Sequence, residues 1–588
     1  MASLRLGAAL AAAALVANVS AQAGDDSNAN VRVWAAVAYI NSAERTPIIG
    51  GLQTVLTPEG AQQMWRQGSA FRNRYLTGGS NSSSSANNTG AATIQNMAKD
   101  ALDNRQLTIL SQADEWVAAG ALAFIQGLYP AKTDAFVDEA GGKDLSHDYA
   151  SGGNVAEYPL NGYQYPKIQT LTTQDSSSVG IQGDVACSAW RSEVGTNLAN
   201  TKVIQDSVNQ SKDLYQKLFS SAPLQGTIPL TSATYLNAYE IYDLVSYLYT
   251  HNETVFKGLQ DANSTLNILR SNAFDLERAK TSHYSTIKDD PLTVLYSIAG
   301  RTLAYQVANK LNGTVAATGA SYKMTLMFGS LRPLLSFLSV GGLMTRENLA
   351  SGPFSRLPEP GAAVVFELFS ERYSSNSGGF PSADDLKIRF YYRATASANE
   401  TFATYPLFGS GFDGPSVPYM SFLHRMQDRS TSPMNWCGVC NPGATASWCS
   451  SSSSHKGASS SETPSISPAV GGVIGAIIMA ALIGFVSLAL FGLGGFRVQR
   501  PGNNERSSTL GGFKGAERMA EDADVAMSKD GSRGERIGSW EMRESGKEHQ
   551  VPSMNAGIVT RDFHRTTSRM EEDGVSVSGA PVKAHESV

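Results

Sequence analysis

An apolar run near the start of the chain constrains its fold more than any other feature. Residues Val31–Ile40 read V-R-V-W-A-A-V-A-Y-I, rich in β-branched and aromatic side chains. Such a run predicts a strand buried on both faces, which is typical of α/β proteins. Farther on, Thr57, Pro58 and Glu59 supply an N-cap, a first-turn proline and an acidic first turn, so a helix is predicted to begin there. Residues 31–76 therefore predict a strand followed by a helix.

The predicted helix after Thr57 has one packed face. Its apolar and small positions recur at spacings of three and four, which places them on one side of a helix. They are Met64, Gly68, Phe71 and Tyr75. A second apolar run, Met324–Phe328, also precedes a helical pattern and repeats the strand-then-helix order. Helical periodicity covers two more segments, Ser232–Tyr249 and Pro291–Leu311.

Length and composition exclude several classes of protein. The chain has 588 residues, too many for one ordinary domain, and 42% of them are hydrophobic, enough for a sizeable core. A formal charge of −5 is small for this length and gives no reason to expect nucleic-acid binding. The sequence has neither a phosphate-cradling glycine loop nor clustered metal ligands, so no cofactor and no metal are predicted.

The N-terminus predicts a secretory signal peptide over residues 1–23. Arg5 precedes the apolar run Leu6–Val19, and the motif A-Q-A ends at Ala23, a pattern typical of a cleaved signal. An uncleaved N-terminal anchor is the weaker interpretation, because the apolar run is too short to span a bilayer.

Near the other end, Ala469–Phe496 is uncharged and mostly apolar, which predicts a transmembrane helix. At about 1.5 Å rise per residue, such a run can cross a hydrocarbon core of about 30 Å. Arg497 and Arg500 follow it and place the C-terminal flank in the cytosol. The prediction is a single-pass protein of the secretory pathway, at the plasma membrane, with its N-terminal domain outside. Gly471 and Gly475 have a G-x-x-x-G spacing that allows the span to dimerise, although the oligomeric state stays open.

The other segments complete the predicted organisation. An ectodomain covers residues 24–443, and a Ser-rich stalk covers 444–468, since this stretch has almost nothing to bury. The tail, 497–588, mixes both charge signs without an apolar period, which predicts disorder. The predicted mature chain has N-glycosylation sequons before the span and none after it, as expected for an extracellular domain. They are at Asn81, Asn87, Asn209, Asn252, Asn263, Asn312 and Asn399.

The end of the first predicted strand carries the most specific pattern. Tyr39–Pro47 reads Y-I-N-S-A-E-R-T-P, and the next helix carries L-T-P-E-G-A-Q-Q-M-W-R-Q-G-S-A-F-R-N-R-Y. This combination resembles the histidine acid phosphatases, the acid-phosphatase and phytase branch of the histidine phosphatase superfamily. That family carries R-H-G-x-R-x-P after an apolar strand, and L-T-x-x-G-x-x-Q with G-x-x-x-R-x-R-Y in the helix.

Three more segments resemble the same family, so that the similarity spans most of Val31 to about Asn441. They are Ser111–Pro130, Phe328–Leu331 and the W-C-G-V-C motif at Trp436–Cys440, the last resembling fungal members. The resemblance implies an α/β fold with a mainly parallel central sheet flanked by helices. It also implies a mostly helical insertion, roughly within 132–290.

In this family a histidine attacks phosphorus in-line, two arginines and a second histidine hold the phosphoryl oxygens, and an aspartate protonates the leaving oxygen. Arg45 alone keeps the expected type in this chain. Removing the nucleophile of a well-studied protease costs on the order of 10⁶-fold in turnover, so no catalytic residues are predicted here. In register, the degenerate positions are Asn41 and Trp116 for arginines, Ser42 for the nucleophile, Ser330 for the second histidine and Leu331 for the acid.

The favoured function is therefore a membrane-anchored glycoprotein with an inactive phosphatase-like ectodomain and a binding or cell-surface role. The alternative is an active acid phosphatase with a non-standard site, in which Ser42 would need a base and only Glu44 lies near it in sequence. A third hypothesis is that the tail signals to cytosolic partners.

The histidines of the chain give no substitute for the missing groups. The pair His147-Asp148 follows a Gly-Gly-Lys loop and is typical of a surface. Three other histidines are isolated, as ordinary surface or core histidines are: His251, His283 and His424.

Arg45 and Trp116 allow two interpretations. In the first, Arg45 grips a phosphorylated or other anionic ligand, and Trp116 stacks on it or blocks it. In the second, which is favoured, Arg45 forms a structural salt bridge and Trp116 fills the core, since such ion pairs are common.

The cysteines also allow two interpretations. Cys437 and Cys440 form a C-x-x-C motif, which suits a redox pair or half of a zinc site. Structural disulfides are favoured, because the signal peptide predicts an oxidising lumen and Cys187 and Cys449 complete an even count. Four cysteines allow three pairings, and the sequence does not choose among them.

Overall fold

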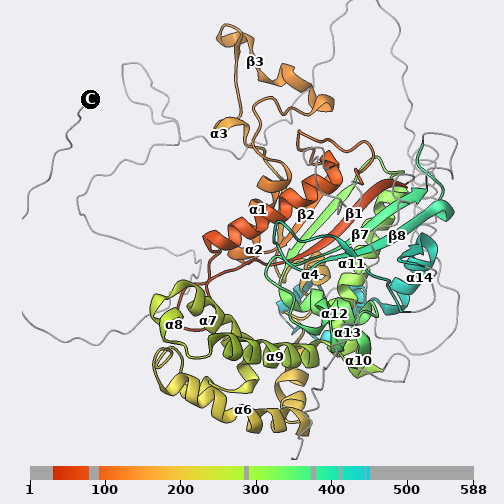
Figure 1. The fold of residues 1–588 in the computed structure, drawn as a ribbon. Coiled ribbons are helices and arrows are strands. Elements are labelled where there is room, and N and C mark those ends of the chain that lie inside the picture. The colour runs from red at the N-terminus through yellow and green to blue at the C-terminus, as the bar shows by residue number, and fades with distance from the viewer. Residues whose placement is uncertain are drawn as a thin grey trace, which may run out of the picture. The chain divides into compact units, whose positions relative to one another are not determined.

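In the computed structural model, the apolar run near the start of the chain forms β1 (Val31–Asn41), a central strand of an eight-stranded sheet (Figure 1). The buried strand predicted over these residues is confirmed. The second predicted strand is β6 (Met324–Gly329), which lies beside β1 and runs parallel to it. Two segments almost 300 residues apart in the chain therefore become neighbours in the sheet.

The structure describes residues 31–78, 92–283, 290–371, 379–409, 414–443 and 445–449. All of them belong to the first of the chain's two units, Met1–Glu462. The predicted signal peptide, most of the predicted stalk, the predicted membrane span at 469–496 and the predicted tail lie outside these residues. No helix within the described ranges is long and apolar enough to cross a membrane.

The sheet is mixed, and the expectation of a mainly parallel sheet is wrong for half of it. β1, β6, β2 and β5 run parallel, whereas β7, β8, β9 and β10 pair antiparallel. β7 and β8 are consecutive in the chain as well as adjacent in the sheet, and such neighbours run antiparallel because a parallel pair needs a long crossover. In spatial order the strands are β10 (Ser416–Pro418), β8 (Leu386–Arg393), β7 (Ala363–Glu371), β1, β6, β2 (Leu107–Gln112) and β5 (Ile168–Leu171), with β9 (Ala403–Thr404) paired to β8.

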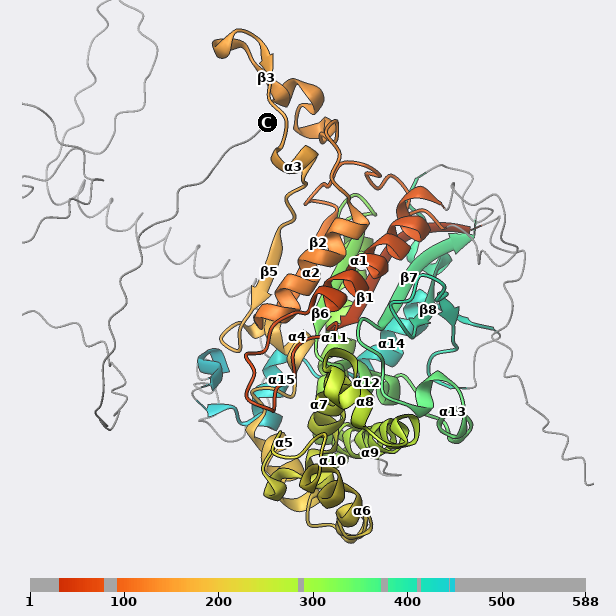
Figure 2. The ribbon, with the colours of Figure 1, turned by 60° about the vertical axis from the view of Figure 1, so that its left-hand side comes forward.

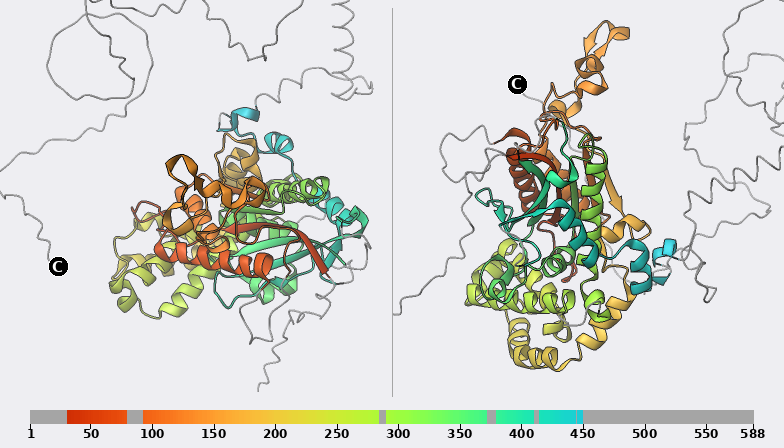
Figure 3. Two further views of the ribbon diagram at one scale, coloured as in Figure 1. Left: turned by 90° about the horizontal axis from the view of Figure 1, so that it is seen from above. Right: turned by 90° about the vertical axis from the view of Figure 1, so that its right-hand side faces the viewer.

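Helices cover both faces of this sheet, as Figure 3 shows from two directions. Successive side chains of β1 enter two different cores, Ala38 and Ile40 on one face and Val37 and Tyr39 on the other. The first face packs against α1 (Pro58–Arg72) and α2 (Glu115–Leu128). The second packs against α4 (Val179–Gln182), α11 (Ile298–Ala316), α12 (Leu331–Val340) and α14 (Tyr419–Arg429).

Helix α1 begins where the sequence predicts. The Thr57 hydroxyl oxygen accepts a 3.0 Å hydrogen bond from the backbone N–H of Gly60, and Pro58 is the first helical residue. The predicted packed face is confirmed, since Met64, Gly68 and Phe71 are all buried. At Gly68 the backbones of α1 and α2 approach so closely that only a glycine fits.

A helical lobe lies between β5 and β6 in the chain and gathers at the carboxyl end of β1 (Figures 1 and 2). Its helices enclose a separate hydrophobic core, in which α7 packs against α9. The segment 132–290 also contains β5, so its helical part begins after that strand. The helices of the lobe are α6 (Lys202–Ser220), α7 (Ala238–His251), α8 (Glu253–Gly258) and α9 (Ala262–Thr281).

Short elements complete the described part. An antiparallel pair, β3 (His147–Asp148) with β4 (Asn154–Val155), lies in the arm that projects upward in Figure 2. The helical periodicity predicted for 232–249 and 291–311 is confirmed by α7 and by α10 with α11. The short helices are α3 (Pro159–Gly162), α5 (Ser188–Ser192), α10 (Pro291–Tyr296), α13 (Arg346–Ala350) and α15 (Pro433–Cys440).

Candidate functional site

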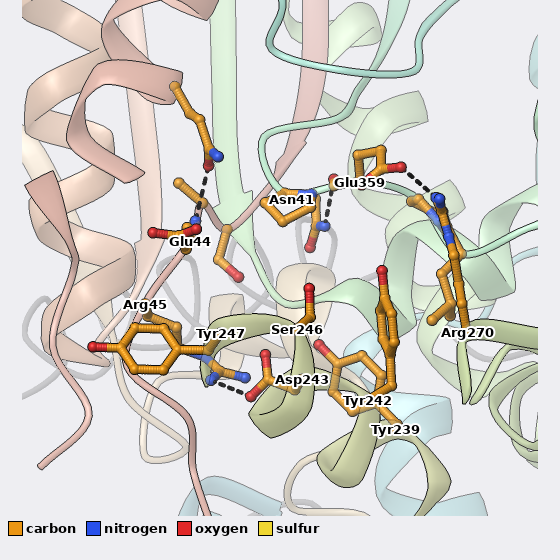
Figure 4. A pocket seen from close by; sticks show the side chains of 16 residues that line it. Asn41, Glu44, Arg45, Tyr239, Tyr242, Asp243, Ser246, Tyr247, Arg270 and Glu359 are labelled. Atoms are coloured by element: carbon orange, nitrogen blue, oxygen red, sulfur yellow. Dashed lines mark hydrogen bonds and ion pairs between the residues drawn. The ribbon is translucent and has the colours of Figure 1, made fainter. Parts of the chain in front are cut away.

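The carboxyl end of β1 opens into a pocket of about 240 Å³. The pocket lies between the strand end, helix α7 of the helical lobe and the loop before β7 (Figure 4). Ligands of open α/β sheets commonly bind at the carboxyl ends of strands, so this pocket is the candidate site. Its charged lining residues are Glu44, Arg45, Asp243, Arg270 and Glu359.

Asn41 and Ser42 line the pocket where the resemblance expects an arginine and a histidine. Asn41 is 5% exposed, and its Nδ2 donates a 3.0 Å hydrogen bond to the backbone oxygen of Glu359. Its Oδ1 is buried and has no hydrogen-bond partner in the described structure. The Ser42 N–H donates to the Gly329 oxygen at 2.7 Å, and the Ser42 oxygen accepts from Gly361 at 3.1 Å. These backbone bonds fix the end of β1 between β6 and the loop that leads into β7.

Arg45 is held by an acid from the helical lobe. Its Nη1 donates to Asp243 Oδ2 at 2.8 Å and to the Thr46 backbone oxygen at 3.1 Å. Burial alone would lower the pKa of the guanidinium, but the Asp243 carboxylate outweighs that effect, so the pKa of Arg45 is raised. Burial also raises the pKa of Asp243, against the opposing charge of Arg45. The guanidinium lies 5.9 Å from the ring centroid of Trp116. The structure therefore contains the salt bridge of the second interpretation, with Trp116 packed beside it.

The other charged groups of the pocket also have partners. On the far side of the pocket in Figure 4, Arg270 forms an ion pair with Glu359. Glu44 accepts a 2.6 Å hydrogen bond from the Thr57 hydroxyl, and its Oε1 lies 2.9 Å from Nε2 of His251. Both arginines that line the pocket are thus bound to carboxylates. An incoming anion would have to compete with those carboxylates for either guanidinium.

The end of β6 offers no acid. Ser330 accepts a 2.8 Å hydrogen bond from the Tyr39 hydroxyl through its backbone oxygen, and Gln112 Nε2 lies 3.4 Å from its Oγ. Leu331 begins α12 and is buried in the core of the helical lobe. Neither Ser330 nor Leu331 lines the pocket. A hydrocarbon side chain therefore occupies the position at which the resemblance expects the proton donor.

A buried charge network follows immediately after Leu331. Arg332 Nε donates to Glu277 Oε2 at 2.7 Å, and its Nη1 lies 3.7 Å from Asp184 Oδ2. Lys280 Nζ lies 2.8 Å from Glu277 Oε1. Burial alone would raise the pKa of Glu277, but Arg332 and Lys280 outweigh it and lower that pKa to about 2. The network ties α9 of the helical lobe to the start of α12.

None of the four described histidines lines the pocket. His251, at the end of α7, contacts two residues that line the pocket. It lies beside Glu44 and packs on Tyr247, with 4.6 Å between the ring centroids. His147 stacks on Tyr149 in the projecting arm. Within the described ranges, no three residues among His, Cys, Asp and Glu cluster as metal ligands would.

All four cysteines are paired. Cys187 is bonded to Cys440, and Cys437 is bonded to Cys449. The two cysteines of the C-x-x-C motif therefore have different partners, so they form neither a redox pair with each other nor a zinc half-site. The disulfide interpretation is confirmed, with a pairing that the sequence left open.

Comparison with known proteins decides the family. The chain matches the family model of the histidine phosphatase superfamily (branch 2) over residues 17–392, more than half of its length. The chain belongs to this family. No curated protein matches it. The phytase from Citrobacter braakii has a similar structure, with 13% identity, a TM-score of 0.41, and coverage of 68% of this chain and 99% of that one. The Bifidobacterium longum multiple inositol polyphosphate phosphatase in complex with phosphate gives 12% identity, a TM-score of 0.37, and coverage of 70% and 96%.

In this histidine phosphatase superfamily member, the structure brings together only part of the predicted site. Asn41, Ser42 and Arg45 line one pocket, with Trp116 beside Arg45. Sequence reasoning missed the residues that neutralise the pocket arginines, Asp243 and Glu359, and also Arg270. These residues come from α7, α9 and the loop before β7, hundreds of positions from β1, and no local pattern marks them.

Proposed function

We propose that this chain is a membrane-anchored glycoprotein whose histidine phosphatase ectodomain does not hydrolyse phosphate esters and serves as a binding module at the cell surface. One observation carries the proposal: Ser42 follows the last residue of β1 and lines the pocket, and none of the histidines that the structure describes lines it. Hydroxyl groups are weak nucleophiles unless a base activates them. Among the described residues, the Ser42 hydroxyl has no hydrogen-bond partner of any kind.

The charges of the pocket support the same conclusion. Phosphoryl transfer depends on positive groups that stabilise the charge spread over the phosphoryl oxygens. Arg45 and Arg270 are bound to Asp243 and Glu359, and Glu44 adds a further carboxylate. Among the described residues that line the pocket, no cation is therefore left uncommitted for a phosphoryl group.

Membrane anchoring and glycosylation rest on the sequence. The apolar run 469–496, the signal at 1–23 and the one-sided sequons support a single-pass protein with its ectodomain outside. The five described sequon asparagines are exposed, as attachment of a glycan requires: Asn209, Asn252, Asn263, Asn312 and Asn399. Removing N-glycans from protein made in secretory cells should increase its mobility on a denaturing gel, and an unchanged mobility would contradict this part of the proposal.

A phosphatase with a non-standard site is the second candidate. It is favoured by two observations, the contact of His251 with Glu44 two residues after Ser42, and the burial-raised pKa of Asp114 near Arg45. A histidine and carboxylate near a serine are the parts from which such sites are built. No hydrogen bond links Ser42 to His251 in the described structure, which is why this candidate ranks second.

Phosphate release by the full chain decides between the two candidates. Purified protein in lipid nanodiscs would be given p-nitrophenyl phosphate and inositol hexakisphosphate at acidic and neutral pH, beside Ser42→Ala and Arg45→Ala. The proposal predicts the same background release from all three proteins. Turnover by the wild type that disappears in either variant would overturn the proposal and identify the non-standard site.

A further inference from the structure

The pocket presents hydrogen-bonding groups that suit a ligand different from a phosphate ester. Where the resemblance expects a cation, Asn41 presents a neutral amide whose buried Oδ1 has no hydrogen-bond partner among the described residues. In Figure 4 this oxygen points into the space between β1 and α7. A buried acceptor without a partner costs free energy, and a ligand that donates a hydrogen bond to it would recover that cost. At neutral pH a phosphate monoester is mostly a dianion, whose phosphoryl oxygens are acceptors and cannot do so.

The groups around Asn41 are hydroxyls rather than free cations. Ser42 offers a hydroxyl with no partner among the described residues, and Ser246 on α7 directs its hydroxyl toward the same space (Figure 4). A hydroxyl both donates and accepts. A ligand rich in hydroxyls can therefore match Asn41 and Ser42 at once, whereas a ligand with only acceptors cannot.

The walls of the pocket supply flat, weakly polar surfaces. Tyr242 and Tyr247 of α7 line the pocket, and so do Pro358 and Pro360 of the loop before β7. Tyrosine pairs an apolar ring with a polar hydroxyl, so it can contact the C–H face of a sugar ring and bind one of its hydroxyls. A volume of about 240 Å³ lies below the range of roughly 300–1,000 Å³ of sites for drug-sized ligands. The space suits a single small ring.

We propose that this pocket binds one neutral monosaccharide unit, without any covalent step, and discriminates against its phosphorylated form. The inference rests on the proposed function, since it gives the inert ectodomain a ligand. The arginine–carboxylate pairs then hold α7 and the loop before β7 around the sugar, and Asn41 and Ser42 bind its hydroxyls.

The test is titration calorimetry with saturation-transfer NMR on the full chain in lipid nanodiscs, because glycoside detergents would compete. The probes are glucose, mannose and galactose, with glucose 6-phosphate and inorganic phosphate as charged counterparts. The expected result is binding of at least one neutral sugar with a Kd of roughly 1 mM or tighter, and at least about tenfold weaker binding of glucose 6-phosphate. No saturable binding of any of the three sugars overturns the inference, as does equal or tighter binding of the phosphorylated sugar.

Variants locate the sugar in this pocket. Asn41→Leu removes the unpaired acceptor and should weaken sugar binding at least about tenfold, and the accessible Ser42→Ala should weaken it about threefold. Thermal melts report whether Asn41→Leu still folds, and Ser42→Ala keeps the test decisive if it does not. Binding that both variants retain would overturn the assignment. Release of phosphate by the wild type that Ser42→Ala or Arg45→Ala abolishes would refute the proposed function. Absence of both phosphate release and sugar binding would refute only the sugar site.

Discussion

Arg45 and Asp243 lie 198 positions apart in the chain, and Nη1 of the arginine meets Oδ2 of the aspartate at 2.8 Å. Among the positions at which the resemblance expects catalytic or phosphate-binding groups, Arg45 alone keeps a residue of the expected type. Its charge faces a carboxylate that the helical lobe brings to the end of β1. The ion pair links the helical lobe to the end of β1, and it also neutralises the charge of Arg45 in the pocket. One contact therefore contributes both to the packing of the lobe and to the low net charge of the site.

Removing the charge of Asp243 should free the cation. We expect Asp243→Asn to lower the free energy of unfolding by about 1–3 kcal/mol, because a largely buried guanidinium loses its partner. The same variant should bind inorganic phosphate at least about tenfold more tightly than the wild type, since Arg45 is then uncommitted. Calorimetric titration and denaturant unfolding measure the two effects. Asp213→Asn, at an exposed position on α6, is the control that should change neither; unchanged phosphate affinity in Asp243→Asn would show that other groups exclude anions.

Removing Arg45 instead should make stability depend on pH. The pKa of Asp243 is already raised by burial, and without the opposing arginine it rises further. The folded state then binds a proton more readily than the unfolded state, so Arg45→Ala should lose most stability at neutral pH and regain part of it as the pH falls through the raised pKa. Unfolding curves at several pH values measure this. The double variant Arg45→Ala/Asp243→Asn should be more stable than Arg45→Ala at neutral pH, and a double variant that is less stable would contradict an unpaired buried charge.

Removing Glu277 from its ion pair with Arg332 should change the pH dependence of stability in the opposite direction. The pKa of Glu277 is lowered from 4.5 to about 2, so its contribution is fully present above about pH 4.5 and is lost as the pH falls toward 2. Glu277→Gln should therefore cost about 3 kcal/mol at neutral pH, with the difference from wild type shrinking over that acidic interval. Glu253→Gln, which removes an exposed ion pair on α8, should change stability little. A constant difference at all pH values would mean that Glu277 is not ionised in the folded protein.

The crossing of α1 and α2 should not tolerate a methyl group. A Cβ atom at Gly68 would lie 1.9 Å from the backbone oxygen of Phe124, which cannot move without shifting α2. We expect Gly68→Ala to cost about 3 kcal/mol or more in thermal or denaturant unfolding. Gly313→Ala is the matched control, because this glycine lies inside α11 with nothing within 4 Å of its Cβ position. The control should be neutral or gain up to about 1 kcal/mol from helix propensity. Equal effects of the two substitutions would rule out the close crossing.

Part of the fold could be predicted because local patterns have local causes. The run Val31–Ile40 has apolar residues in nearly every position, so it had to be buried on both faces, and the structure places it between two helical layers. Thr57 caps α1 because a hydroxyl at that position satisfies a free N–H group. The direction of β7 and β8 could not be read in this way, since an apolar alternation is the same for parallel and antiparallel neighbours.

The sequence by itself determined which chemical groups are present: an asparagine and a serine after an apolar run, where the resemblance expects an arginine and a histidine, and an even number of cysteines. Only the tertiary structure decided what these groups face. Asp243, Arg270 and Glu359 reach the end of β1 because the helical lobe and the loop before β7 fold over it. The charge of a pocket is a sum over residues that are close in space, and closeness between residues far apart in the chain arises only when the sheet and the lobe pack together.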